Sequence, residues 1–264
     1  MRRAPGFSEE PSEEKGMPAR GPLEALESRE AREAARRIAC LGLSFHVLSY
    51  YVEDTGVDAG VEPLCSGEPR IVIHAASCVD DTLEALKRSL PRILGAPIMG
   101  YTLECVEGFG GEYPGFSQVT SMIVRLFSNT FYKPLSEASV TGREYFVVIG
   151  WNGEIAYGRG GEYEIRLPLI PAVAFAHTHP GLSCYPSAQD LSSAADFLAA
   201  GGLAEFLVSR SCTSSLRLLA PLSEEDYWTL RRVSGCVKGS RESEDYLECL
   251  AALNGLRTVA FEVL

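Results

Sequence analysis

Two of the four histidines in this 264-residue chain stand two positions apart, at the end of an apolar stretch that predicts a strand over 172–179. Side chains two residues apart on a strand point to the same face, so His177 and His179 can reach one point. Asp190, in the first turn of a helix predicted over 187–200, can bring a carboxylate to the same place. Two imidazoles and a carboxylate leave the fourth position of a tetrahedral zinc ion to water, as in catalytic zinc sites. Water on such an ion ionises near neutral pH and becomes a nucleophile.

Each part of this pattern also has a simpler interpretation. A His-x-His pair occurs on protein surfaces and within other kinds of metal site. Ser187 followed three positions later by Asp190 is a capping box, which satisfies free N–H groups at a helix start. A capped helix start also fixes where Asp190 points, so the two interpretations are compatible. In a chain with only four histidines, we favour a metal site made by His177, His179 and Asp190.

The segment His177-Thr178-His179-Pro180, followed by Ser187-x-x-Asp190, resembles the JAMM (MPN-plus) signature H-[ST]-H-P-x(6)-S-x-x-D over its full length. This family of zinc isopeptidases includes the deubiquitinases of the proteasome lid and their archaeal and bacterial relatives. The resemblance covers residues 116–240 and implies a curved mixed sheet packed by helices. It also implies that His177, His179 and Asp190 bind a single Zn²⁺, and that Ser187 hydrogen-bonds the substrate carbonyl oxygen.

The family also uses a glutamate as general base, at the start of the strand that follows its first helix. Glu144 occupies that place, between a helix predicted over 116–131 and a strand predicted over 144–151. The simpler interpretation of Glu144 is a solvated or paired carboxylate at a strand end. Glu154 is the alternative base. It follows the Asn152-Gly153 turn, so its simpler interpretation is a charged side chain of the hairpin.

The activity implied by the resemblance is cleavage of an amide bond at the C-terminal tail of a ubiquitin-like protein or its conjugates. Short connections around the motif are typical of a simpler prokaryotic member, archaeal in the first instance. In such organisms the substrate could also be the tail of a sulfur-carrier protein. A non-catalytic MPN scaffold is the competing hypothesis, but scaffolds of that kind usually lack motif residues that this chain retains. The oligomeric state is left open.

The elements that must position these residues fall into two predicted units and predict a mixed α+β fold. Residues 1–21 are rich in Pro, Gly, Ser and Glu, which predicts a disordered tail. A small α/β unit without an assigned role is expected over 22–112. The metallopeptidase-like domain is expected over 113–264, after a boundary rich in Gly and Pro.

In the first unit, side-chain patterns predict a helix from Pro22, strands over 44–52, 70–75 and 101–106, and a helix over 80–94. In the second unit, the remaining predictions are strands over 154–157, 162–167, 205–210, 215–219 and 258–263, and helices over 223–233 and 241–253. His46 and His74 lie on predicted strands of the first unit. They are expected to be packed or surface side chains rather than metal ligands.

Charge and hydropathy exclude several classes of protein. A formal net charge of -11 argues against binding to nucleic acid. No apolar run reaches the roughly 18 residues that a membrane span needs. The first residues also contain no apolar segment of the kind found in secretion signals, so the predicted location is the cytoplasm. Only four lysines and five side-chain amides occur, which suits either a thermophile or a GC-rich genome.

None of the eight cysteines is spaced as C-x-x-C, which argues against a zinc ribbon or a thioredoxin motif. Reduced thiols are expected in a cytosolic mesophile, whereas one or two disulfides are expected in a hyperthermophile. Cys184 lies in the motif loop and Cys212 lies at the end of the strand that follows the next helix, so these two could form a disulfide that holds the loop. Two free thiols at these positions are the equally open alternative.

Overall fold

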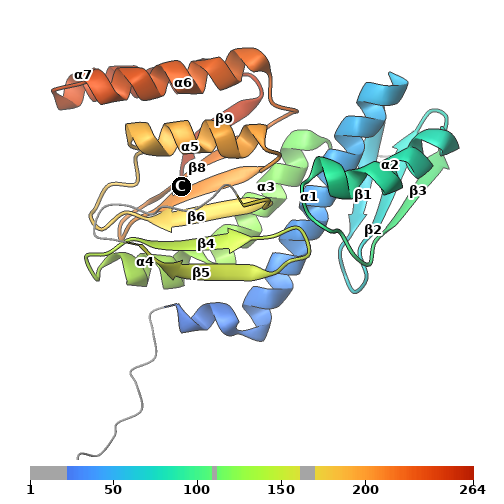
Figure 1. Ribbon diagram of the computed structural model, residues 1–264, viewed down its shortest axis with the longest axis horizontal. Helices are drawn as coiled ribbons and strands as arrows, with labels where there is room; N and C mark the ends of the chain where they lie inside the picture. The colour runs from blue at the N-terminus through green and yellow to red at the C-terminus, as the bar shows by residue number, and fades with distance from the viewer. Residues whose placement is uncertain (1–22, 109–111, 161–169) are drawn as a thin grey trace, which may run out of the picture.

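The computed structural model describes residues 23–108, 112–160 and 170–264, and it has the mixed α+β fold that the sequence predicts (Figure 1). Its helices are α1 (Arg29–Thr55), α2 (Asp80–Ile93), α3 (Phe116–Thr130), α4 (Tyr132–Ser139), α5 (Ala188–Ala199), α6 (Glu224–Gly239) and α7 (Ser243–Ala251), with 3-10 turns at Glu24–Glu27 and Ala252–Gly255. Its strands are β1 (Ala59–Leu64), β2 (Arg70–Ala75), β3 (Thr102–Glu107), β4 (Tyr145–Ile149), β5 (Ile155–Arg159), β6 (Ala174–Thr178), β7 (Ala204–Val208), β8 (Thr213–Leu218) and β9 (Val259–Val263). The predicted tail 1–21 and the predicted strand 162–167 lie outside the described residues.

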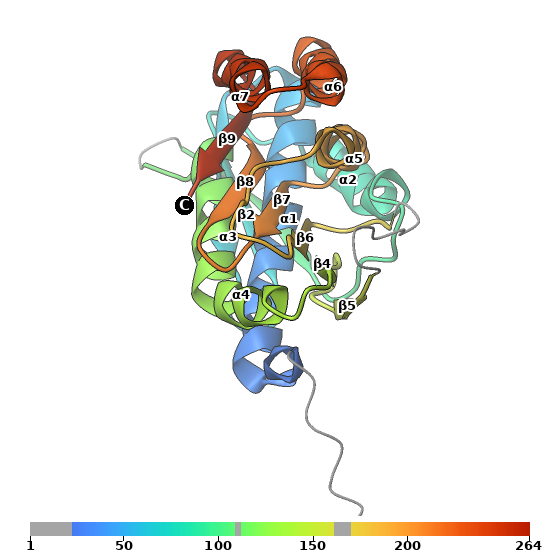
Figure 2. The same ribbon diagram turned by 90° about the vertical axis from the view of Figure 1, so that its left-hand side faces the viewer.

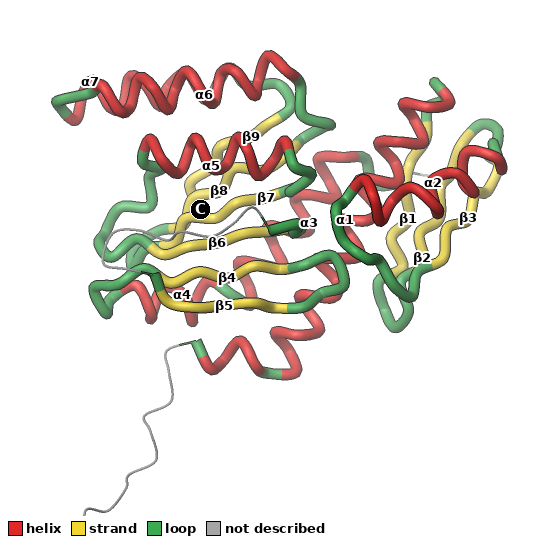
Figure 3. The backbone as a smooth tube through the Cα atoms, in the orientation of Figure 1, coloured by secondary structure: helices red, strands yellow, loops and turns green. Residues whose placement is uncertain are grey.

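A six-stranded sheet in the order β5-β4-β6-β7-β8-β9 forms the centre of the larger unit (Figure 3). Its β6–β7 pair is parallel and its other pairs are antiparallel, so the sheet is mixed as expected. Helices cover both faces, with α1, α3 and α4 on one side and α5 and α6 on the other (Figure 2). The strand β6, which carries His177 and ends one residue before His179, therefore lies in the middle of the sheet beneath α5.

A second, three-stranded sheet in the order β1-β2-β3 is covered by α2 and by the C-terminal half of α1 (Figure 1). The pair β1–β2 is antiparallel and the pair β2–β3 is parallel. The predictions for β2, α2 and β3 are confirmed, and α2 continues through Pro91 rather than splitting there. The first strand of this unit is β1, which the sequence analysis does not predict.

The predicted strand over 44–52 is wrong, because this segment is the C-terminal part of the 27-residue helix α1. The hydroxyl of Ser28 caps the start of α1, and Gly56, in the left-handed conformation at φ 64°, ends it. Between these caps, aromatic and β-branched side chains are buried on every side of the helix. A helix buried all round loses the polar face that would distinguish it from a buried strand.

The helix α1 joins the two units, since it packs on α3 and β4 of one and on β1 and α2 of the other. Gly42 permits close approach to the large sheet, because a Cβ atom there would lie 2.6 Å from a methyl carbon of Val173. Buried side chains from both units form one continuous apolar cluster. The boundary between two domains at residue 112 therefore stays a prediction. No helix within the described ranges is both long and apolar enough to cross a membrane.

Candidate metal centre

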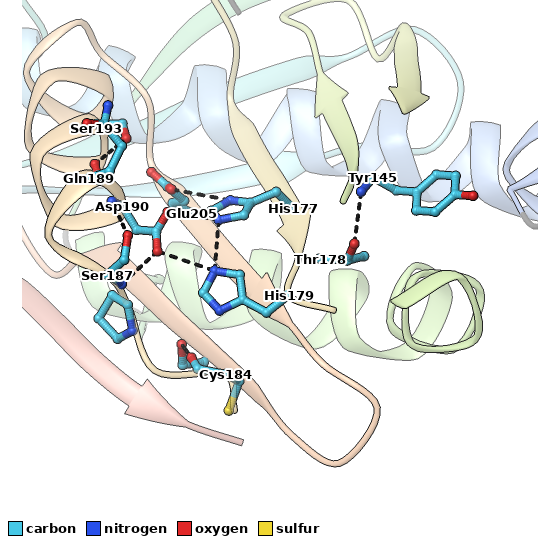
Figure 4. Close-up of polar contacts among 12 residues, drawn as sticks. Tyr145, His177, Thr178, His179, Cys184, Ser187, Gln189, Asp190, Ser193 and Glu205 are labelled. Atoms are coloured by element: carbon cyan, nitrogen blue, oxygen red, sulfur yellow. Dashed lines mark hydrogen bonds and ion pairs between the residues drawn. The ribbon is translucent and has the colours of Figure 1, made fainter. Parts of the chain in front are cut away.

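The rings of His177, in β6, and of His179, one residue past its end, both project toward α5, as the strand period predicts. Figure 4 shows their rings converging, with the Nε2 atoms of His177 and His179 3.2 Å apart. Ladder pairing to β4 and β7 on either side holds His177 in the middle of the sheet, and the backbone N–H of His179 donates to the carbonyl of Val208 at 2.8 Å. Both rings therefore sit on a rigid support.

The start of α5 brings Asp190 to the same point. Its Oδ1 lies 3.1 Å from Nε2 of His177, and its Oδ2 lies 3.3 Å from Nε2 of His179. The capping box is present as well. The Ser187 hydroxyl accepts from the Asp190 N–H at 3.2 Å, and the Ser187 N–H donates to Oδ2 of Asp190 at 2.6 Å. The helix cap and the convergence of the carboxylate on the histidines thus coexist, and the first supports the second.

The three side chains have the spacing of metal ligands. Ligand atoms about 2.05 Å from a tetrahedral zinc ion lie about 3.3 Å from one another, close to the separations observed here. One ligand atom from each of His177, His179 and Asp190 lies within 4.8 Å of the others, and this group could hold a metal ion. His177 is buried, and the other two are partly buried, so a ligand could still reach the group from solvent.

The electrostatics show how strongly the three groups interact. Burial alone would raise the pKa of Asp190, but hydrogen bonds from His177 and His179 hold that pKa far below its usual range. Burial alone would lower the pKa of His179. Its hydrogen bond with Asp190 and the negative charges of Asp190 and Glu144 outweigh burial, so the pKa of His179 lies above its usual value. Negative charge is therefore concentrated around the histidines, which favours a cation.

Glu144 lies immediately before β4, the strand that pairs with β6. The antiparallel register pairs Phe146 with His177, and one further step of two residues places Glu144 opposite His179. The N–H of Tyr145 donates to the hydroxyl of Thr178 at 2.9 Å and ties the two strand ends together. The charge of Glu144 also acts on His179, which agrees with this placement.

The alternative glutamate, Glu154, lies at the opposite end of β4. Its Oε2 accepts from the backbone N–H of Asn152 at 2.9 Å and closes the Asn152-Gly153 turn, which agrees with the hairpin interpretation. The other two histidines are packed, as predicted. His46 bonds the Gly201 carbonyl through Nε2 at 2.8 Å, and His74 stacks on Tyr113 with ring centroids 3.6 Å apart.

Glu205 also lies beside the centre, although no motif in the sequence marks it. This residue is in β7, is 1% exposed, and has its Oε1 3.8 Å from Nδ1 of His177 (Figure 4). Burial, together with the charge of Asp190, raises the pKa of Glu205 well above its usual range. The available signal was a single acidic residue inside the apolar strand AEFLV, next in space to the motif strand.

All eight cysteines are paired in the structure, which corrects the expectation of reduced thiols. Of the two alternatives left open for Cys184 and Cys212, the disulfide is the one present. The other three are Cys40–Cys65, Cys78–Cys105 and Cys236–Cys249. Disulfides are typical of oxidising compartments and of intracellular proteins of hyperthermophiles. A cytoplasmic location, which stays a prediction, therefore agrees with four disulfides only in a hyperthermophile.

Comparisons of this chain with models of protein families, with curated proteins and with solved structures found no match. The similarity to the JAMM signature therefore rests on the motif residues of the sequence.

Proposed function

We propose that this protein is a zinc-dependent metallopeptidase of the JAMM type, which hydrolyses an amide bond at the C-terminal tail of a ubiquitin-like protein. The observation that carries the proposal is the convergence of His177, His179 and Asp190 on one point, with Glu144 placed opposite His179 at the neighbouring strand end. The motif spacing supports the family, and the family supplies the substrate class.

Zinc is the metal proposed, since two imidazoles and one carboxylate with one open position form a common catalytic donor set for this ion. Bound here, it would polarise a substrate carbonyl and lower the pKa of a water molecule. His177, His179 and Asp190 would hold it, since their ligand atoms converge on one point. The three side chains therefore suit a zinc ion.

Glu144 and Ser187 have the remaining roles. The Glu144 carboxylate can take a proton from the attacking water and pass it to the leaving amine, which must depart as a neutral group. The Ser187 hydroxyl accepts one hydrogen bond from the helix start and still has a proton to donate, because a hydroxyl has one donor besides its lone pairs. That proton can stabilise the charge that develops on the carbonyl oxygen.

The test measures metal content and cleavage of a ubiquitin-like protein fused to a C-terminal reporter peptide. We expect stoichiometric zinc in the wild type, loss of zinc and activity in His179→Ala, and retained zinc with activity about 10²–10⁴-fold lower in Glu144→Gln. Glu154→Gln is the matched variant on the same hairpin, and its activity should be unchanged.

The outcomes separate the competing functions. A wild type that binds no zinc would refute the proposal. Stoichiometric zinc without cleavage of any ubiquitin-like fusion, including one with a sulfur-carrier tail, would favour the MPN scaffold. Loss of activity in Glu154→Gln but not in Glu144→Gln would transfer the general base to Glu154.

A further inference from the structure

Two buried polar groups face each other beside the candidate metal centre. Nδ1 of His177 and both carboxylate oxygens of Glu205 are fully buried and make no hydrogen bond within the described ranges. The closest approach between them is 3.8 Å, from Nδ1 to Oε1. A buried ionisable group without a partner is costly, so such groups are rare in folded proteins. Two of them side by side next to a proposed metal ligand call for a physical explanation.

The chemistry of His177 indicates which atom carries the proton. Its Nε2 faces Asp190 and His179, so Nε2 is the atom that would bind a metal. A neutral imidazole that binds a metal through Nε2 has its proton on Nδ1. That N–H group is buried and points toward the Glu205 carboxylate (Figure 4). In the described part of the chain, the His177 ring is the one ion-pair partner recorded for Glu205.

The position of Glu205 follows from the sheet. The strand β7 runs parallel to β6, and Glu205 pairs with Phe175, two residues before His177. The next residue, Phe206, points to the opposite face, where its ring stacks on Phe127 of α3 with centroids 3.8 Å apart. Alternation along the strand therefore directs Glu205 to the α5 face, where the histidines are.

We propose that Glu205 is a positioning residue of the metal centre, whose carboxylate accepts a hydrogen bond from Nδ1–H of His177 and so holds the ring with Nε2 toward the metal. This role rests on the proposed zinc centre. The bond requires the 3.8 Å separation to shorten by about 1 Å, which a small rotation of either side chain supplies. Partners of this kind fix the tautomer of a ligating histidine and make it a stronger ligand.

The proposal predicts effects of opposite sign in the metal-free and metal-bound proteins. Without metal, the buried carboxylate is poorly compensated, so a leucine of similar volume should leave the protein equally stable or make it more stable. With zinc, the same substitution removes the acceptor for His177 and weakens metal binding. A purely structural role of Glu205 would instead lower stability in both states.

The experiment determines zinc affinity by competition with a chromophoric chelator, and the stability of the metal-free protein by guanidinium unfolding. Glu205→Leu should bind zinc about 10–100-fold more weakly than the wild type. Glu205→Gln, whose amide oxygen can still accept the bond, should lose less than about tenfold. The visible spectrum of the cobalt-substituted protein should change in Glu205→Leu, since it reports ligand geometry independently of activity.

The matched control is Phe206→Leu, one residue along β7 and on the opposite face. It should lower stability and leave zinc affinity unchanged. Zinc affinity of Glu205→Leu equal to that of the wild type would overturn the positioning role, and so would an equal loss in Glu205→Gln and Glu205→Leu. If the wild type binds zinc and His179→Ala does not, these outcomes leave the proposed metal centre intact. Absence of zinc binding by the wild type would refute both proposals.

Discussion

Removal of the disulfide Cys184–Cys212 tests whether the motif loop depends on a covalent link. This bond closes a separation of 28 residues, and Cys184 lies between the second histidine and Ser187. In the chain-entropy description, closing such a loop restricts the unfolded chain and stabilises the fold by about 3.6 kcal/mol. The double substitution Cys184→Ala with Cys212→Ala should therefore lower the free energy of unfolding by this amount.

Hydrogen bonds hold the same loop without the disulfide. The hydroxyls of Ser209 and Ser211 donate to the carbonyl of Leu182, at 3.3 and 2.5 Å. The hydroxyl of Ser214 donates to the carbonyl of Cys184. Because these bonds persist in the folded state, the loop should keep its shape in the variant. We therefore expect zinc affinity to stay within about threefold of the wild type, which corresponds to about 0.6 kcal/mol.

The matched control is the pair Cys236→Ala and Cys249→Ala, whose disulfide joins α6 to α7 across 13 residues. The same description gives about 2.9 kcal/mol for this bond, so the two variants should differ by only about 0.7 kcal/mol. Guanidinium unfolding without reductant and chelator competition measure the two quantities. A tenfold loss of zinc affinity in the Cys184 variant alone would refute the reasoning, since the disulfide would then shape the folded loop. Detection of eight free thiols in the denatured, unreduced wild type would refute the pairing itself.

Three further predictions concern protons and a buried carboxylate. The pKa of metal-free His179 is raised, since its hydrogen bond with Asp190 and the nearby negative charges outweigh burial. Zinc must displace the proton of His179, so zinc affinity should rise with pH through this raised pKa. A chelator-competition profile that is flat from pH 6 to 9 would contradict this prediction. Burial lowers the pKa of His46 from 6.5 to about 4, so the unfolded chain takes up the proton first, and stability should fall by about 3 kcal/mol as pH drops from 6.5 to 4. Unfolding experiments at pH 7 and pH 4.5 should show that His46→Phe removes this loss. The Asp226 carboxylate accepts hydrogen bonds from the backbone N–H groups of Arg257 and Thr258 and from the Thr258 hydroxyl, just before β9. Asp226→Ala should therefore lower the free energy of unfolding by about 3 kcal/mol, measured by thermal unfolding. A loss below about 1 kcal/mol would contradict this stabilising role.

Local spacing predicted the centre because its geometry is local. Two residues on one strand must share a face, and a capping box must place Asp190 in the first turn of α5. Both arrangements follow from backbone periods that every strand and helix obeys. The approach of Glu144 to His179 was predicted from the resemblance, and the register between β4 and β6 gives it a geometric basis.

The prediction of a strand over 44–52 was wrong for a physical reason. Its aromatic and β-branched residues are typical of strands, and nothing within nine residues reveals that α3, β1 and the large sheet surround it. Burial on all sides removes the polar stripe by which an amphipathic helix is recognised. The short elements α4 and β1 escaped prediction as well, since their patterns are too brief to carry a clear period.

By itself, the sequence determined the strand, the capped helix and the three candidate ligand positions, because residues separated by two to thirteen positions are placed by local backbone geometry. Only the tertiary structure decided which residues of other strands meet them. Glu205 is 28 residues from His177 in sequence and reaches it through the parallel pairing of β7 with β6. The four cysteine pairs likewise join segments 13 to 28 residues apart, and their choice of partner depends on how helices and strands pack rather than on spacing.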